Sequence, residues 1–293
     1  MPSTAAGVDV NAAINPTNID FMNCLLLINR IKYTALLAMI ISIVDASSSQ
    51  AQGSLSDSSK TYALIWHDEF DGETINPLLW NFEIGNLGTN HEKQAYKAEN
   101  ATVKGGFLTI TAKKESAYGQ PYTSSRINTK GKFAIPGGRI EAYIKCPMGK
   151  GLWPAFWMLG YDIEEVGWPK CGEIDIMEHV NADTIVYGTI HWDKNGHAMY
   201  GIKAPTTPGE FHLYAVEWDK DEISWYVDKT RIGSSNIKNG INNTGVFRHP
   251  FYILFNFAVG GDFPGTTTSV DESLLPAKME VDYVRVYEIR RNR

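Results

Sequence analysis

Short alternations of apolar and polar residues fill the chain from about Thr61 onward, and Gly, Pro, Asn and Asp residues interrupt them. Residues 107–111 and 139–145 alternate most cleanly, and no amphipathic helical pattern of useful length appears. The other expected strands are residues 153–159, 173–178, 186–192, 213–218, 222–227, 252–259 and 279–287. Nine or more strands in one continuous stretch predict a single all-β sandwich rather than two domains. Residues 233–245 are polar and Asn-rich, which predicts a surface loop.

The longest apolar stretch precedes these strands, in residues 24–44, where it is interrupted by Arg30 and Lys32. The uninterrupted part, from Tyr33 onward, falls short of the roughly 20 apolar residues that span a bilayer. Basic residues, then apolar residues 34–44, then small polar residues ending at Ala51 are typical of a secretory signal peptide. We therefore expect a leader in residues 1–51, with Met22 as an alternative start, one folded domain in residues 52–293, and a secreted or periplasmic protein. A buried helix or a retained membrane anchor is the alternative.

Charge and cysteine content narrow the function classes. The chain has 27 Lys+Arg and 33 Asp+Glu, a formal net charge of -6, so it lacks the basic field that holds a nucleic acid or an acidic membrane surface. Cys24, Cys146 and Cys171 are too few for a disulfide scaffold and lack the spacing of a zinc site. Cys146 and Cys171 either pair with each other after export or remain two buried thiols.

Residues 172–179, Gly-Glu-Ile-Asp-Ile-Met-Glu-His, carry the most informative chemistry. In a regular strand Glu173 and Asp175 share a face, whereas Glu178 points to the other face. A β-bulge at Ile176 and Met177 would bring all three acids onto one face, and bulges often re-aim side chains near active sites. Crowded carboxylates raise at least one pKa, which keeps one acid protonated beside an ionised one. Glycoside hydrolysis needs that pair, but a solvated acidic edge strand is the alternative.

Tryptophans flank this acidic run and favour the catalytic interpretation. Residues 149–160 place Trp153 and Trp157 on one strand face and Phe156 and Met158 on the other. Flat aromatic rings stack against the apolar faces of sugar rings, so one set of these side chains is expected to line a sugar-binding surface. Core packing is the better expectation for another four tryptophans, Trp66, Trp80, Trp218 and Trp225.

The acidic run and its flanks together resemble glycoside hydrolase family 16, and within it the laminarinase-like endo-β-1,3-glucanases. The motifs that carry the resemblance are residues 66–72 (Trp-His-Asp-Glu-Phe-Asp-Gly), Asn90-x-x-x-Gln94-x-Tyr96, 122–126, 139–142, 153–160, 173–178, 255–261 and 281–287. The resemblance implies a jelly-roll β-sandwich of two curved antiparallel sheets with a concave substrate cleft. It also implies a monomeric, secreted hydrolase whose partner is a β-glucan polysaccharide.

Catalytic roles follow from the resemblance for the three acids. Glu173 matches the family nucleophile, Glu178 its acid/base, and Asp175 the assisting acid between them. The implied reaction is retaining double displacement, which needs carboxyl groups roughly 5–5.5 Å apart. His191 matches a polar position near the acid/base, where it either hydrogen-bonds Glu178 or is an ordinary strand histidine.

The resemblance also implies residues that bind the glucan and a metal. The expected substrate-binding residues are Asn90, Arg126, Trp153, Trp157, Trp168, Trp192 and Asn256. Arg126 is alternatively a surface ion-pair residue. Some relatives bind a structural calcium, and the matching positions here are Asp68 or Glu69, Gly106 and Asp282. No cofactor is implied for catalysis.

Met177 and the nearby arginines bear on which polysaccharide is cleaved. Met177 makes the acidic run one residue longer than in lichenase-type relatives and favours the bulged branch, which also contains agarases and carrageenases. Recognition of a sulfated galactan calls for arginine clusters, and only Arg126 and Arg139 lie near the run, so we expect a neutral β-1,3-glucan. A β-1,3-1,4-glucanase, a galactan hydrolase, a transglycosylase and a non-catalytic β-glucan-binding protein are the alternatives.

Overall fold

The computed structural model describes residues 60–265 and 269–291. The predicted leader, including the alternative start at Met22 and the residue Cys24, lies outside the described residues, as does the boundary at residue 51. Within the described part of the chain, no helix is long and apolar enough to cross a membrane.

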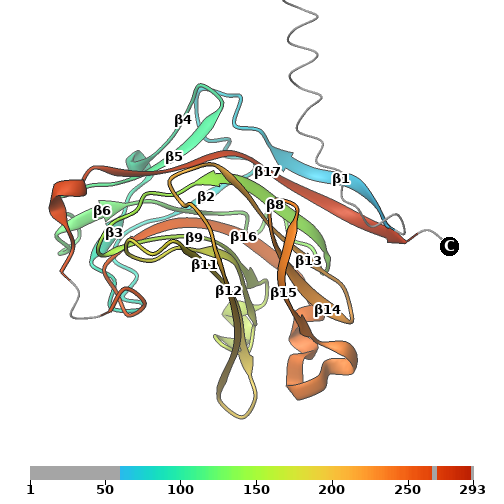
Figure 1. Ribbon diagram of the computed structural model, residues 1–293. Helices are drawn as coiled ribbons and strands as arrows, with labels where there is room; N and C mark the ends of the chain where they lie inside the picture. The colour runs from blue at the N-terminus through green and yellow to red at the C-terminus, as the bar shows by residue number, and fades with distance from the viewer. Residues whose placement is uncertain (1–59, 266–268, 292–293) are drawn as a thin grey trace, which may run out of the picture. The chain divides into compact units, whose positions relative to one another are not determined.

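One sheet contains seven antiparallel strands, which Figure 1 shows bending along their length. Its strands, in spatial order, are β12 (His197–Pro205), β11 (Ile185–Asp193), β10 (Glu173–Glu178), β9 (Leu152–Gly160), β16 (Phe251–Val259), β7 (Arg126–Asn128) and β2 (Asn81–Glu83). The acidic run forms β10, which lies between β9 and β11 and is therefore an interior strand. This position excludes the solvated edge strand that the sequence left open.

The second sheet has eight antiparallel strands and lies against the first. In spatial order they are β15 (Thr230–Asn236), β14 (Glu222–Val227), β13 (His212–Trp218), β8 (Gly138–Lys145), β17 (Ala277–Arg291), β5 (Phe107–Ala112) and β4 (Ala101–Lys104), and β1 (Lys60–Asp68) also pairs with β17 (Figure 1). A short parallel pair joins β3 (Gln94–Tyr96) to β6 (Tyr122–Ser124). Among the described residues, the helical elements are η1 (Ala98–Asn100), α2 (Ile163–Val166), η2 (Lys238–Arg248) and η3 (Glu272–Leu274).

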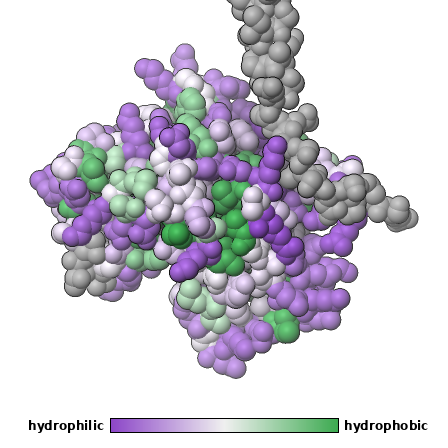
Figure 2. Space-filling view, viewed as in Figure 1, coloured by the Kyte–Doolittle hydropathy of each residue, from purple (hydrophilic) through white to green (hydrophobic). Residues whose placement is uncertain are grey.

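The facing sides of the two sheets enclose one large core. Strand β4 shows how the sequence pattern produces it, because Ala101 and Val103 are buried while Thr102 and Lys104 are exposed. On the opposite sheet, Phe156, Met158, Ile174 and Met177 contribute to the same core. Figure 2 shows that the face in view is largely hydrophilic, with hydrophobic residues gathered in a few small patches.

The predicted all-β sandwich of two antiparallel sheets is confirmed, and each of the nine predicted strands is present. The loop prediction for residues 233–245 is partly wrong, because β15 extends to Asn236 and η2 covers the rest. Cys146 and Cys171 are separate buried thiols, so they do not pair. Trp80, Trp218 and Trp225 are fully buried, and Trp66 packs against the core, as expected.

Candidate active site

A β-bulge in β10 aligns the three acids. Asp175 pairs with Trp157 of β9, but the next pairing joins Met177 to Phe156, so β10 contains one extra residue at this point. The register with β11 shifts in the same place, between Asp175 and Glu178. The predicted bulge at Ile176 and Met177 is therefore confirmed. Glu173, Asp175 and Glu178 lie on one side of the sheet, which we call the acid-bearing face, and the apolar residues between them belong to the core.

Core contacts hold the bulged backbone in place. The Trp225 indole N–H donates to the backbone carbonyl of Asp175 at 2.7 Å, from the opposite sheet. Gly188 makes room for this indole, because a Cβ at that position would lie 2.5 Å from the Trp225 ring. Met177 packs beneath the acids, with its sulfur 3.7 Å from the Cys146 sulfur. These contacts stabilise the bulge through the tightly packed core rather than through the acids themselves.

Each outer acid accepts a hydrogen bond from a tryptophan. The Trp168 indole N–H donates to Glu173 Oε2 at 3.0 Å, and the Trp153 indole N–H donates to Glu178 Oε1 at 2.9 Å. Both bonds fix the rotamer of a carboxyl group and favour its ionised form. The two tryptophans therefore hold the acids as well as presenting aromatic surface.

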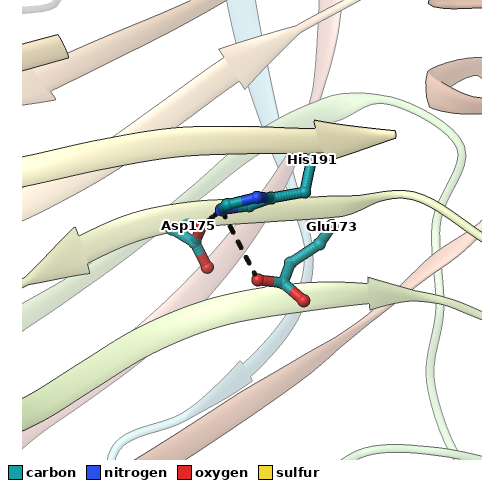
Figure 3. Close-up of side chains that lie close together, drawn as sticks. All are labelled: Glu173, Asp175 and His191. Carbon is teal, nitrogen blue, oxygen red and sulfur yellow. Dashed lines mark ion pairs between the residues drawn. The ribbon is translucent and has the colours of Figure 1, made fainter. Parts of the chain in front are cut away.

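His191 contacts a different acid from the one expected. Its Nε2 atom lies 3.2 Å from Asp175 Oδ2 and 3.9 Å from Glu173 Oε1, and Figure 3 shows the three side chains pointing toward one another. The expectation of a bond to Glu178 is thus corrected. The register explains the difference, because His191 pairs directly with Glu173 across β10 and β11, whereas Tyr187 pairs with Glu178.

Burial controls the protonation of the acids. Burial, and after it the neighbouring Asp175, raise the pKa of Glu173 to about 8. Burial also raises the pKa of Glu178 to about 7, against the lowering effect of the Trp153 hydrogen bond. The pKa of Asp175 rises well above its usual range through burial and the proximity of Glu178. The cluster therefore retains protons at neutral pH, so a carboxyl group that ionises there has protonated carboxyl neighbours.

Glu173, Asp175 and His191 also offer ligand atoms that lie within 4.8 Å of one another. Among the described residues, they are the only such group of three or more His, Cys, Asp or Glu side chains. A metal ion there would occupy the carboxylate oxygens that acid–base or nucleophilic chemistry needs. The cluster is thus more consistent with direct carboxyl chemistry.

Four of the predicted substrate-binding residues meet beside the acids. Trp157 donates from its indole N–H to Asn256 Oδ1 at 2.7 Å, and the Arg126 guanidinium carbon lies 4.7 Å from the centre of the Trp157 ring. Trp153 is bonded to Glu178, as described above. Arg126 also pairs with Glu83 at 3.1 Å, so it forms the ion pair that the sequence left open, but it does so on the acid-bearing face.

Two further predicted residues, Asn90 and Trp168, lie in loops near this face. Gly261 packs between Asn90 and Trp153, since a Cβ added to it would lie 3.0 Å from the Asn90 carbonyl oxygen and 3.2 Å from the Trp153 ring. Trp168, in the segment between β9 and β10, is 48% exposed and packs against His197 with ring centres 4.7 Å apart. Its exposed indole is available to a ligand while its N–H holds Glu173.

Trp192 does not belong to the acid-bearing face. Its ring packs edge-on against Phe247 in the core, and its N–H donates to the carbonyl of Asn242 at 2.8 Å. Because successive strand residues alternate between faces, Trp192 and the adjacent His191 cannot both face the acids. The prediction that Trp192 binds substrate is wrong for this reason.

The sequence patterns did not predict that His197 lies at the site, where it contacts His191 and Trp168. Its Nε2 lies 2.8 Å from His191 Nδ1, and its ring packs on Trp168. The signal was present in Asn195 and Gly196, a dipeptide typical of hairpin turns, and both adopt positive φ angles here. That turn begins β12, the edge strand that the apolar pattern missed.

The raised pKa of Glu173 predicts a pH-dependent cost in stability. A folded-state pKa of about 8 means that ionising this carboxyl opposes folding, so its cost grows as pH rises from about 4.5 to about 8. We expect Glu173→Gln to raise the free energy of unfolding by about 2–4 kcal/mol at pH 8. At pH 4 the two proteins should differ little. Urea unfolding at both pH values measures this, and an equal difference at both would contradict the assignment of the pKa.

Comparisons with known proteins agree with this geometry. Residues 88–285 match the model of glycosyl hydrolases family 16. The beta-glucanase of Rhodothermus marinus is 40% identical over 252 residues, which are 79% of this chain and 87% of that protein. The clotting factor G alpha subunit of Tachypleus tridentatus is 39% identical over 233 residues, 78% of this chain, but the match spans only 34% of that longer protein.

The fold is also similar to that of solved laminarinase structures. The laminarinase catalytic domain from Thermotoga maritima MSB8 superposes with a TM-score of 0.71 and 44% identity, and the match covers 78% of this chain and 98% of that domain. The agreement extends over almost the whole of that catalytic domain.

Proposed function

The chain belongs to glycosyl hydrolases family 16, and from this premise we propose that it is an endo-β-1,3-glucanase that cleaves laminarin-type glucans with retention of configuration. The observation that carries the proposal is the bulge that sets Glu173, Asp175 and Glu178 on one face with raised pKa values. A non-catalytic glucan-binding protein has no need for this arrangement, since buried carboxyl groups cost stability.

Double displacement assigns one step to each outer acid. The Glu173 carboxylate attacks the anomeric carbon while Glu178 gives its proton to the leaving oxygen, which breaks the glycosidic bond and forms a glycosyl ester. Glu178, now ionised, takes a proton from water, and that water opens the ester and restores the Glu173 carboxylate. Trp168 orients Glu173 and Trp153 orients Glu178 through their N–H bonds.

Asp175 and His191 assist the nucleophile. Asp175 is 4% exposed and lies between the outer acids in the sequence of β10, with His191 on its Oδ2 atom. A protonated Asp175 adds no second negative charge beside Glu173, so it lets Glu173 ionise while the cluster carries few charges. His191 stabilises whichever of these acids is ionised, because its imidazole N–H can donate to a carboxylate.

The arginines favour a neutral polysaccharide over a sulfated one. Arg126 is engaged by Glu83 and lies against Trp157. Arg139 belongs to β8 of the other sheet, where it is buried between Glu141 and Glu217. Neither guanidinium is therefore poised to pair with a sulfate on the acid-bearing face. Mixed-linkage β-1,3-1,4-glucan is the second substrate that this neutral, aromatic surface suits.

A digestion panel tests the proposed activity. Laminarin, lichenan, agarose and carrageenan are incubated with the full chain, and products are separated by length and anomeric configuration. We expect short β-1,3-linked oligosaccharides from laminarin, with the β-anomer formed first, and slower cleavage of lichenan. Products longer than the starting chains would indicate transglycosylation, and cleavage of carrageenan or agarose alone would overturn the proposal.

The protein's location and assembly are parts of the same proposal. We propose export from the cytoplasm, supported by the apolar run in residues 34–44 and by the polymeric substrate, which does not enter cells. We also propose a monomer with no stable membrane association.

We propose a structural calcium ion at Glu69, Gly106 and Asp282. The side chain of Asp282 suits this role, whereas that of Glu69 does not. The pKa of Asp282 is raised by burial and by the nearby Glu69 and Asp71, so a cation would relieve a crowded negative site. The Glu69 carboxylate is already bound by Arg285 through both oxygens, at 2.9 and 2.7 Å. Glu69 and Gly106 would therefore contribute backbone carbonyls, with Asp282 as the carboxylate ligand.

Calcium is expected to raise the melting temperature of the protein by a few degrees, because it binds the folded state alone. Asp282→Asn should lose this response and retain its melting temperature in EDTA. Thermal unfolding with 1 mM calcium or EDTA, for both proteins, measures the effect. An equal calcium response in the variant would show that Asp282 is not a ligand.

A further inference from the structure

A buried chain of hydrogen bonds runs from Glu92 to Trp157. Glu92 Oε2 accepts from Gln94 Nε2 at 2.6 Å and from the Tyr96 hydroxyl at 3.0 Å. The Tyr96 oxygen accepts from Asn256 Nδ2 at 3.2 Å, and Asn256 Oδ1 accepts from the Trp157 indole at 2.7 Å. Gln94, Tyr96 and Asn256 are all buried. The chain therefore connects a carboxylate outside the catalytic cluster to an aromatic ring on the acid-bearing face.

The two ends of this chain fix its direction. An ionised Glu92 can only accept, so the Tyr96 hydroxyl must donate to it and use its oxygen as the acceptor. Asn256 must then turn its NH₂ group toward Tyr96 and its carbonyl toward Trp157, whose indole N–H can only donate. Burial and the Glu92 charge raise the pKa of Tyr96 well above its usual range, so Tyr96 keeps the proton that it donates. The Glu92 charge at one end and the Trp157 N–H at the other thus specify the same orientation of the Asn256 amide.

Glu92 also holds the loop that carries Asn90. Its Oε1 atom accepts from Asn90 Nδ2 at 3.2 Å, and Asn90 adopts a positive φ of 51° that few non-glycine residues take. The Asn90 carbonyl accepts from the backbone N–H of Asp262 at 2.8 Å. Gln94, another of the three side chains that donate to Glu92, accepts from the N–H of Val259 through Oε1 at 2.7 Å. Three of the predicted substrate-binding residues, Asn90, Trp157 and Asn256, are therefore tied to one carboxylate.

We propose that Glu92 is a positioning residue for glucan binding, which acts through Tyr96 and Asn256 on Trp157 and directly on Asn90. The inference rests on the proposed function and deepens it by naming what orients the sugar-binding residues. Glu92 donates nothing to the reacting atoms, so its loss should weaken binding more than chemistry. The effect of Glu92 on Trp157 should depend on the Tyr96 hydroxyl, which connects Glu92 to Asn256.

Glu92→Gln and Tyr96→Phe test this relay. A glutamine can donate to Tyr96 and so reverse the Tyr96 hydroxyl toward Asn256, where it competes with the Trp157 N–H for the Asn256 carbonyl, whereas phenylalanine interrupts the chain. We expect each variant to raise the KM for laminarin about tenfold, with kcat within about twofold of the parent. The double variant should be no worse than the poorer single one, because an interrupted chain cannot be reversed. Glu115→Gln is the matched control, because Glu115 also accepts from a hydroxyl, that of Thr123, and its variant should keep the parental KM.

Binding measurements separate this inference from the proposed activity. Calorimetry with laminari-oligosaccharides, in the Glu173→Ala background, reports affinity without turnover. A tenfold weaker affinity on adding Glu92→Gln or Tyr96→Phe supports the relay even if laminarin hydrolysis were absent from the parent. Unchanged affinity in both variants, or KM increases that multiply in the double variant, would overturn it. A variant with a lower melting temperature but parental affinity would show a purely structural network and would also overturn it.

Discussion

Laminarin hydrolysis is expected to fall at least about 10⁴-fold in kcat when Glu173 is replaced by alanine, because no glycosyl ester can then form. Glu178 cannot substitute for it. The two carboxyl groups are held apart by separate tryptophans, Trp168 and Trp153, and the bulge fixes their spacing along β10. Reducing-sugar release from laminarin measures the loss, with the melting temperature as a check on folding.

Glu164→Ala is a suitable control for this experiment. Glu164 lies in α2, with an exposed side chain that pairs with Lys130, and its removal takes away one carboxylate without touching the acid-bearing face. The control should keep parental activity. Unchanged sugar release in the Glu173 variant would remove the catalytic assignment altogether, whereas a loss in both variants would point to a nonspecific effect of charge.

Local patterns were sufficient to predict the catalytic strand. The three acids, with apolar residues between them, fit one face of a strand only if one residue is inserted, and the structure has that insertion at Ile176 and Met177. The alternation of Trp153 and Trp157 with Phe156 and Met158 likewise needs only the period of two along a strand. Predictions of this kind depend only on residues that are neighbours in the sequence, so they need no knowledge of which strands pair.

Predictions that depend on which strands pair were less accurate. His191 contacts Asp175 rather than Glu178 because of its register on β10, in which it pairs with Glu173 and the bulge shifts the pairing between Asp175 and Glu178. Trp192 lies on the core side of β11, although the resemblance implies a substrate-binding position, because it alternates with His191 along the strand. Strand β12 itself is mostly exposed, so it lacks the apolar pattern by which the other strands were found.

Side-chain contacts between residues far apart in the chain could not be predicted from the sequence. Tyr96 and Asn256 are 160 residues apart and meet because β3 lies against β16 in the fold. The motif containing Gln94 and Tyr96 was visible, but nothing in it shows that both side chains turn toward Glu92. A buried polar network is specified by packing and mutual satisfaction of donors and acceptors, which appear only when the sheets are assembled.

Glu178→Ala should produce a loss that depends on the leaving group, because Glu178 acts by protonating it. We expect kcat on laminarin to fall about 10²–10⁴-fold, while the first release of phenol from an aryl β-glucoside with an activated phenol as leaving group should be almost as fast as in the parent. In this variant the ester still forms, but no base activates water to open it. Azide should therefore raise turnover, since it attacks without giving up a proton.

The azide products distinguish the two acids by stereochemistry. In Glu178→Ala, azide opens the ester from the face opposite Glu173 and should give a β-glycosyl azide. In Glu173→Ala, azide replaces the missing nucleophile and should give an α-glycosyl azide from the activated substrate, with no ester in between. Proton NMR of the anomeric position separates these products. The same anomer from both variants, or no azide product from either, would show that the roles of nucleophile and acid/base are wrongly assigned, because only two residues on opposite sides of the anomeric carbon give opposite outcomes.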